Sequence, residues 1–175
     1  KQKIHIGRII TKGMGAGMNP DMGRQAAEES QADIAETLQG ADMIFLAAGF
    51  GGGTGTGATP VVADIARETG ALVVAIVTKP FTFEGIQRQR IAEEAWHQLK
   101  DRVDALITIH NDRLLNVITK DTSLLNAFTI CDDVLRQAVQ GISDLIITPG
   151  IINVDFADVR AIMADAGSAL MGVGF

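Results

Sequence analysis

Six glycines fall within nine residues at positions 49–57, in the run GFGGGTGTG. The run directly follows the apolar stretch 43–48 and directly precedes residues 58–62, which suit a helix. This order predicts a buried strand, a turn with few side chains, and then a helix. Backbone N–H groups in such a turn, together with the helix N-terminus, can all point at an anion, so the pattern favours phosphate binding.

A plain turn, a Walker loop and a dinucleotide fold fit the glycine run less well. A plain turn rarely needs so many glycines, and Thr54 and Thr56 add hydroxyl donors where a phosphate would lie. The Walker phosphate loop is excluded because the run lacks its lysine and its spacing. Residues 53–58 match the looser G-x-G-x-x-A pattern of dinucleotide domains, which leaves a dehydrogenase as the competitor. That class needs an acidic ribose ligand after the next strand, where this chain has Thr78 and Lys79.

Apolar periodicity predicts alternating strands and helices along the chain. The predicted strands are 4–6, 42–48, 71–77 and 103–109, and the predicted helices are 19–38, 57–69, 85–100, 112–118 and 123–146. Asn19 and Pro20 form a good cap and first turn for the first helix. Alternation of this kind predicts a three-layer α/β fold, with a mainly parallel sheet flanked by helices.

The last of these helices is long and carries one continuous apolar stripe. Its members are spaced by three and four residues: Leu124, Phe128, Cys131, Leu135, Ala138, Ile142 and Leu145. This spacing predicts a long central helix packed lengthwise against the sheet. Pro149 and Gly150 should end it before Asp155 starts another helix, and no linker or repeat divides the chain, so we expect one domain.

Composition excludes several functions. The net charge of −6 and the lack of a basic cluster argue against a nucleic-acid partner. The apolar runs are too short to cross a bilayer. The single cysteine, Cys131, cannot form an internal disulfide and suits a reducing compartment, so we expect a cytoplasmic protein without direct membrane insertion. The three histidines are scattered, and we expect no protein-bound metal.

Five motifs in order, including the glycine run, resemble the FtsZ family of prokaryotic tubulin homologues. The other four are GMGAGMNP at 13–20, KPFTFEG at 79–85, NDRLL at 111–115 and NVDFADV at 153–159. The resemblance covers nearly all 175 residues. It implies a GTP-binding cytoskeletal protein that polymerises head to tail into filaments at the division site.

The resemblance also implies the nucleotide contacts. GTP or GDP would bring Mg²⁺ with it, and its phosphates would lie against Gly15, Ala16, Gly17, Gly51, Gly52, Gly53, Thr54, Gly55, Thr56 and Gly57. By the same resemblance, Glu84 would bind the ribose, Arg88 would approach the phosphates, and Asn111 would help to hold the sugar and base. Without it, Glu84 and Arg88 would be interpreted as a solvated ion pair four residues apart.

Phe128 and Asp132, also four apart, would complete a guanine site. The ring can stack on a purine while the carboxylate accepts hydrogen bonds from N1–H and N2–H₂, which adenine does not offer in the same way. The alternative is that Phe128 belongs to the core and Asp132 to the solvated flank of its helix.

Asn153, Asp155 and Asp158 are the candidate catalytic residues. Two carboxylates three apart at a helix start can orient a water for attack on a phosphate. They can equally serve as an N-cap and a first-turn acid. The family resemblance implies that these residues reach into the nucleotide site of the next subunit, so that hydrolysis is coupled to assembly.

The ends of the chain suggest a fragment. Family members begin with a further strand and phosphate loop and continue into a C-terminal domain, and a terminal peptide recruits division-machinery proteins. We therefore expect residues 1–175 to be part of the GTP-binding domain of a GTPase, binding GTP weakly and hydrolysing little alone. A dinucleotide-dependent oxidoreductase and a non-hydrolysing tubulin-like scaffold are the alternatives.

Overall fold

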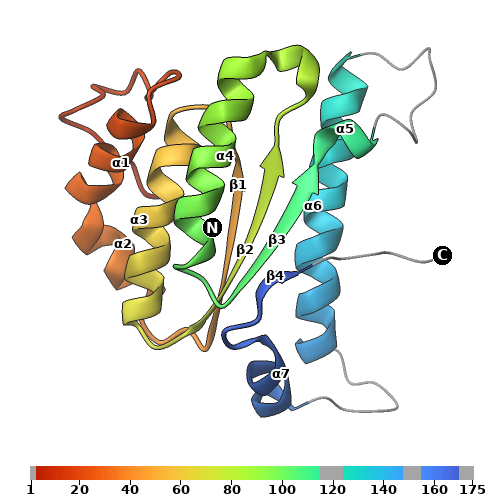
Figure 1. The fold of residues 1–175 in the computed structure, drawn as a ribbon. Coiled ribbons are helices and arrows are strands. Elements are labelled where there is room, and N and C mark those ends of the chain that lie inside the picture. Colours follow the sequence, from red (N-terminus) through yellow and green to blue (C-terminus); the bar gives the residue numbers. More distant parts are fainter. Residues whose placement is uncertain (1–2, 115–123, 148–154, 170–175) are drawn as a thin grey trace.

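A parallel sheet forms the centre of the molecule. The computed structural model describes residues 3–114, 124–147 and 155–169. Four strands lie in the order β1-β2-β3-β4, and each neighbouring pair is parallel. They span Met43–Gly49 (β1), Leu72–Lys79 (β2), Ala105–His110 (β3) and Gly167–Ala169 (β4). Because parallel strands end at one edge, their carboxyl ends bring the loops that follow them close together (Figure 1).

Helices cover both faces of this sheet, as the alternating pattern predicted. Four lie on one side (Figure 1): α1 (Pro20–Glu29), α2 (Gln31–Leu38), α3 (Thr54–Glu68) and α4 (Ile86–Lys100). The other side is covered by α6 (Leu124–Ile147), a helix of 24 residues. The remaining helical segments are η1 (Thr82–Glu84), α5 (Asn111–Leu114) and α7 (Phe156–Met163). The three-layer α/β prediction is therefore confirmed.

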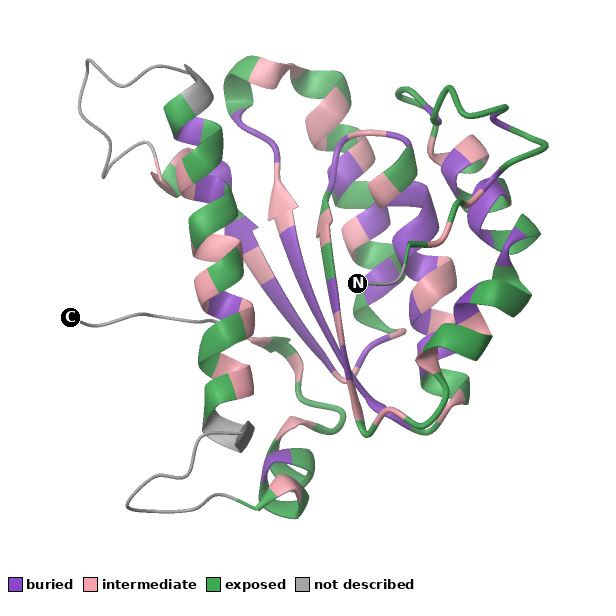
Figure 2. Cartoon of the chain, turned by 180° about the vertical axis from the view of Figure 1, so that it is seen from behind, coloured by how far each residue is buried: buried purple, intermediate pink, exposed green. Residues whose placement is uncertain are grey.

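Two apolar clusters lie on opposite faces of the sheet and form the main core. Residues 71–77 are all buried, which is why this segment has an uninterrupted apolar sequence (Figure 2). One face of β2 packs with α3 and α4, and the other packs against α6 through Leu135, Ala138 and Ile142. Nearer the start of α6, Ala127 and Cys131 pack against the fully buried ring of Phe81. Four members of the predicted stripe thus face the sheet or the loop after β2, namely Cys131, Leu135, Ala138 and Ile142, whereas Phe128 is exposed.

Three predicted boundaries were wrong. Residues 4–6 form no strand, and Ile4 and Ile6 instead pack beside the helices of the first layer. The helix predicted for 19–38 breaks at Ser30, whose backbone leaves helical geometry at φ −107° and ψ 18°. The helix predicted from 57 already begins at Thr54, so the second half of the glycine run is helical.

The other elements lie within a few residues of their predicted ranges. The short helix predicted at 112–118 is α5, and residues 115–118 lie outside the described residues. The sequence also predicts a strand at the end of the chain, residues 172–175, and these residues lie outside the described ones. No helix in the described part of the chain has the length and hydropathy needed to cross a membrane.

Candidate functional site

The predicted nucleotide-binding loops meet at the carboxyl edge of the sheet. The Gly53 N–H donates to the Gly17 carbonyl at 2.7 Å, which joins the loops before α1 and α3. A Cβ on Gly51 would lie 3.1 Å from the Arg88 carbonyl oxygen, so the glycine turn also touches α4. Motifs far apart in the sequence therefore share one edge.

The first turn of α3 offers unpaired backbone donors at this edge. The Gly57 N–H donates to the Gly53 carbonyl at 2.9 Å, and this closes the first helical turn. The N–H groups of Thr54, Gly55 and Thr56 precede it and have no intrahelical acceptor. Gly53, at the N-cap, supplies no side-chain cap. A helix end of this kind carries partial positive charge and can bind an anion.

The glycines of the run have two different roles. A Cβ on Gly53 would lie 2.6 Å from the Gly17 carbonyl oxygen, and one on Gly57 would lie 1.9 Å from the Pro20 carbonyl oxygen. A Cβ on Gly55 would lie 2.7 Å from the Gly49 carbonyl oxygen. A Cβ on Gly52, by contrast, would meet no atom within 4 Å. Close packing thus explains most of the run, whereas Gly52 leaves open space in front of the turn.

The threonine hydroxyls organise the turn itself. The Thr56 side chain is 2% exposed, and its Oγ1 accepts from the Gly51 N–H at 3.0 Å. Thr54 is exposed, and its Oγ1 accepts from the Ala16 N–H at 3.4 Å. The Thr56 hydroxyl oxygen thus holds the turn together by accepting a hydrogen bond. The contact of this hydroxyl with a phosphate stays a prediction.

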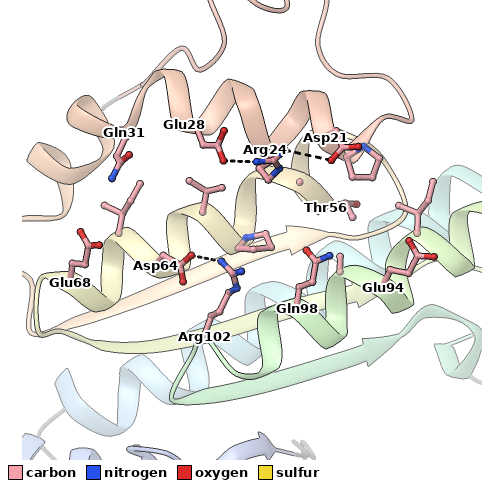
Figure 3. A pocket seen from close by; sticks show the side chains of 17 residues that line it. Asp21, Arg24, Glu28, Gln31, Thr56, Asp64, Glu68, Glu94, Gln98 and Arg102 are labelled. Carbon is pink, nitrogen blue, oxygen red and sulfur yellow. Dashed lines mark hydrogen bonds and ion pairs between the residues drawn. The ribbon is translucent and has the colours of Figure 1, made fainter.

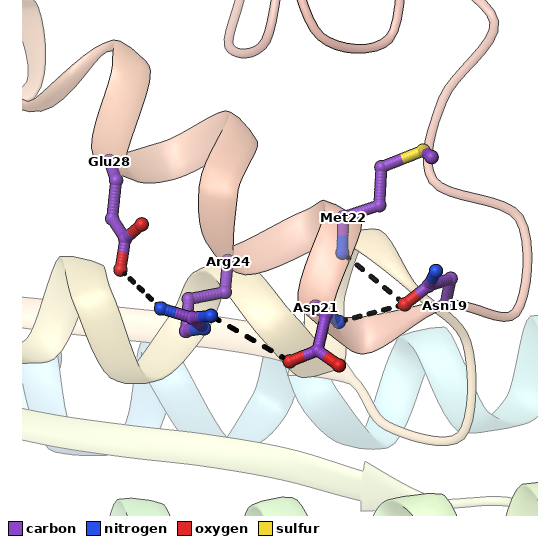
Figure 4. A network of polar contacts seen from close by, with 5 residues as sticks. All are labelled: Asn19, Asp21, Met22, Arg24 and Glu28. Carbon is purple, nitrogen blue, oxygen red and sulfur yellow. Dashed lines mark hydrogen bonds and ion pairs between the residues drawn. The ribbon is translucent and has the colours of Figure 1, made fainter.

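The loop before α1 packs onto this turn. Gly15 and Gly17 both have positive φ angles, of 73° and 56°, while Ala16 between them is buried. The loop ends in a capped helix, because Asn19 Oδ1 accepts from two backbone N–H groups in the first turn of α1, at 3.0 and 3.3 Å (Figure 4). The cap predicted at Asn19 is confirmed.

Glu84 and Arg88 are paired with each other at the edge of the site. Glu84 Oε2 lies 3.4 Å from Arg88 Nη1, and Glu84 Oε1 accepts from the Phe81 N–H at 2.9 Å. The Glu84 side chain is 15% exposed and that of Arg88 is 41% exposed. The ion pair expected from their spacing is therefore present, and both groups lie at the edge where the loops converge.

Asp112 joins the loops after β2 and β3, a role that was not predicted from the sequence. Its carboxylate accepts from the Thr82 N–H at 2.8 Å and from the Thr82 hydroxyl at 2.6 Å. These two hydrogen bonds lower the pKa of Asp112 below its ordinary value. The sequence signal that could have indicated this role is the position of Asp112, an acidic residue next to Asn111 and close to the end of a predicted strand.

Asn111 presents an unsatisfied polar atom. The residue is 5% exposed, and its Oδ1 is buried without a hydrogen-bond partner. A buried amide oxygen without a donor is costly, and in a native structure such an atom often marks a place where a ligand or water binds. Asn111 begins α5 directly after β3, at the same edge as the glycine turn.

Phe128 is not part of the buried core. The residue is 38% exposed, and its ring makes a T-shaped contact with the Phe81 ring, with the centroids 5.5 Å apart. Asp132, one turn further along α6, is exposed. This arrangement leaves the ring and the carboxylate on an accessible face of α6, as base recognition requires.

The thiol of Cys131 lies between these two residues in sequence but points into the core. It is 4% exposed, and burial, together with the Asp132 charge, raises its pKa to about 11.

At pH 8 we expect alkylation of Cys131 by iodoacetamide to be about 100-fold slower in the folded protein than in denaturant. The raised pKa also means that this thiol stabilises the fold below its ordinary pKa of 9.0, and that the contribution is lost as pH rises toward about 11. Equal alkylation rates in both states would contradict the buried position.

The candidate catalytic aspartates lie at the opposite end of the sheet. Asp155 occupies the N-cap position of α7, but its side chain makes no capping hydrogen bond, and Asp158 in the first turn is exposed. Figure 1 shows α7 beyond the amino ends of the strands, away from the glycine turn. One chain therefore does not bring these residues to its own nucleotide-binding edge. Asn153 lies outside the described residues.

Two cavities border this edge of the molecule, and the first is lined in part by Thr56 and Gly57 of the glycine run. The first, of about 630 Å³, lies between α1, α3 and α4 (Figure 3). Two ion pairs lie in its walls, Arg24 with Glu28 and Arg102 with Asp64. Another, of about 580 Å³, lies beside Lys79 and His110. Burial, followed by the charges of Lys79 and Arg113, lowers the pKa of His110. Among residues 3–114, 124–147 and 155–169, no three acidic, histidine or cysteine side chains are grouped as metal ligands.

Comparison with known proteins agrees with this geometry. The sequence model described as "Tubulin/FtsZ family, GTPase domain" matches residues 1–119. An empty FtsZ dimer from M. jannaschii is 47% identical, with a TM-score of 0.90 over 93% of this chain and 47% of that one. A single-residue variant of M. jannaschii FtsZ gives the same identity and TM-score over 94% of this chain and 49% of its own length.

A more distant structure shows the fold alone. A CetZ protein from Haloferax volcanii, in a GTPγS-bound protofilament, is 24% identical, with a TM-score of 0.77 over 95% of this chain and 49% of that chain. The chain thus spans about half the length of the solved structures that it matches.

Proposed function

The chain belongs to the tubulin/FtsZ family, and we propose that it is part of the GTP-binding domain of a filament-forming GTPase. One observation supports the proposal above all others: the glycine turn leads directly into the uncapped first turn of α3, and the space in front of Gly52 is open. A helix N-terminus approached through a position without a side chain suits the phosphates of a nucleotide. The dimer of M. jannaschii FtsZ supports assembly of this chain's parent protein into a homopolymer.

The residues present fit a guanine nucleotide. The N–H groups of Gly51 and Gly53 already have acceptors in the protein, so the phosphates would be held by the Gly52 N–H and by the first turn of α3. The orphaned Oδ1 of Asn111 needs a donor, which a ribose hydroxyl or a base amino group supplies. Asp132 would accept from guanine N1–H and N2–H₂ while the exposed Phe128 ring stacks on the base. Arg88 would reach the phosphates, and Glu84 the ribose, once their mutual ion pair rearranges.

Hydrolysis would require a second subunit. The carboxylates of Asp155 and Asp158 are exposed at the far end of the sheet, and Asp155 does not cap its helix through its side chain. In a head-to-tail filament that end faces the nucleotide edge of the next subunit, where Asn153, Asp155 and Asp158 would orient the attacking water. Magnesium bound with the nucleotide would neutralise phosphate charge.

We further propose that the parent protein acts in the cytoplasm at the division site, with division-machinery partners recruited by segments outside this chain. The dinucleotide alternative is disfavoured, because β2 ends in Thr78 and Lys79, and Lys79 pairs with Glu93 at 2.6 Å. A non-hydrolysing scaffold is disfavoured by the two exposed carboxylates at the start of α7. Purified residues 1–175 would bind GTP weakly and turn it over little, because no neighbour completes the site.

Gly52→Val in the full-length protein tests the nucleotide site. The added side chain meets no protein atom at its Cβ, so we expect the unfolding temperature to change by less than about 2 °C. The side chain would instead occupy the space of a phosphate, and GTP affinity should fall by about 100-fold or more, because the phosphates lose their backbone donors. Fluorescent GTP titration and thermal unfolding measure the two quantities, and unchanged GTP affinity would place the nucleotide elsewhere.

A further inference from the structure

The helix that carries Asp158 is held by few contacts. α7 has eight residues, Phe156–Met163, and a helix of this length is not stable by itself in water. Val159 is its one buried residue, at 9% exposure. Phe156 and Met163 are partly buried against the apolar cluster on the face of the sheet that α6 covers. The direction in which α7 presents its polar face therefore depends on a small number of tertiary contacts.

One of these contacts is polar and joins α7 to the turn before β2. The Arg160 guanidinium donates through Nη2 to the Gly70 carbonyl oxygen at 2.6 Å, a bond between residues 90 positions apart. Gly70 lies in the turn between α3 and β2, and its own N–H donates to the Arg67 carbonyl at 3.1 Å. The acceptor thus belongs to a fixed turn. A hydrogen bond from a charged donor is strong and directional, which suits it to fix an orientation.

The position of Arg160 determines where Asp158 points. Residues two apart on an α-helix are separated by about 200° around its axis. When Arg160 faces the Gly70 turn, Asp158 must face away from it, and Asp158 is indeed exposed. Rotation of α7 about its axis would break the bond to Gly70 and turn the Asp158 carboxylate toward the sheet.

We propose that Arg160 is a positioning residue, which holds Asp158 in the orientation needed to complete the nucleotide site of the next subunit. The inference rests on the proposed function. The proposal also involves α3, which starts at the glycine turn and ends two residues before Gly70. One rigid helix of 15 residues, about 22 Å long, therefore separates the nucleotide turn of a subunit from the anchor of its own α7. The bond from Arg160 to Gly70 therefore helps to fix the distance between the glycine turn of a chain and the Asp158 carboxylate of the same chain.

The test compares Arg160→Met with Arg160→Lys in the full-length protein. Methionine keeps an apolar stem but removes the donor, whereas lysine keeps a cationic donor. Arg67→Met is the matched control, because Arg67 also donates from an exposed guanidinium to a carbonyl, that of Asp101 at 3.2 Å, without touching α7. GTP turnover per polymerised subunit, GTP affinity, and hydrogen exchange of the α7 amides in the unassembled protein are measured for each.

For Arg160→Met we expect turnover to fall by about tenfold or more, since small misplacement of a catalytic group is costly, with GTP affinity changed less than about twofold. The α7 amides should exchange faster, and Arg160→Lys should recover part of both effects. Unchanged exchange in Arg160→Met would overturn the proposal even if that variant fails to assemble, and so would wild-type turnover in its filaments. If Asp158→Ala also leaves turnover unchanged, the proposed function itself fails, which separates the two outcomes.

Discussion

Replacing Asp158 by alanine in the full-length protein is expected to lower GTP turnover by about 100- to 10,000-fold, the usual contribution of a positioned acid or base. GTP affinity should stay the same, because α7 lies at the other end of the sheet from the glycine turn. In the wild type, turnover per subunit should rise above a critical protein concentration, since a neighbour completes each site. Phosphate release measured against protein concentration, with fluorescent GTP binding beside it, separates the two effects.

The alternative role of Asp158 is a favourable interaction with the dipole of α7. Such an interaction contributes about 0.3 to 1 kcal/mol to stability and would leave turnover nearly unchanged when removed. Asp144→Ala is the control, because Asp144 is an exposed aspartate of the described part of α6. A turnover that does not depend on concentration, or that survives Asp158→Ala, would reduce the two aspartates to helix-end residues and favour the scaffold alternative.

Gly57→Ala is expected to destabilise the fold by about 3 kcal/mol, the upper range for forcing an extra group into a packed interior. At an exposed helical position the same change would stabilise by roughly 1 kcal/mol, because alanine favours helices. Here the new Cβ would lie 1.9 Å from the Pro20 carbonyl oxygen and 2.7 Å from the Arg24 nitrogen. Both are backbone atoms of α1, so neither can move without shifting that helix. Urea denaturation of the two proteins gives the difference in unfolding free energy.

Gly52→Ala provides the contrast within the same run. A Cβ there meets nothing within 4 Å, so the free energy of unfolding should change by less than about 0.5 kcal/mol. A Gly57→Ala protein as stable as the wild type would mean that α1 and α3 do not approach as closely as the structure places them. The pair of variants therefore distinguishes glycines required by packing from the glycine that leaves room for a ligand.

Most of the architecture could be predicted from local patterns. Residues 71–77 are continuously apolar because β2 is buried on both faces, and alternation with amphipathic helices required parallel strands. Asn19 could be identified as a cap because an Asn–Pro pair satisfies the first turn of a helix locally. The strand predicted at 4–6 was wrong because none of the four described strands pairs with it, and Ile4 and Ile6 pack against helices instead.

The sequence by itself determined that candidate ligand residues follow three successive parallel strands, β1, β2 and β3, and such loops meet at one edge. Only the tertiary structure decided which glycines serve packing, because the approach of Gly57 to Pro20 joins two helices whose distance no spacing encodes. The same holds for the buried Asn111 oxygen without a partner and for the bond from Arg160 to Gly70. Contacts between distant segments depend on how the layers pack, whereas periodicity and capping depend only on neighbours along the chain.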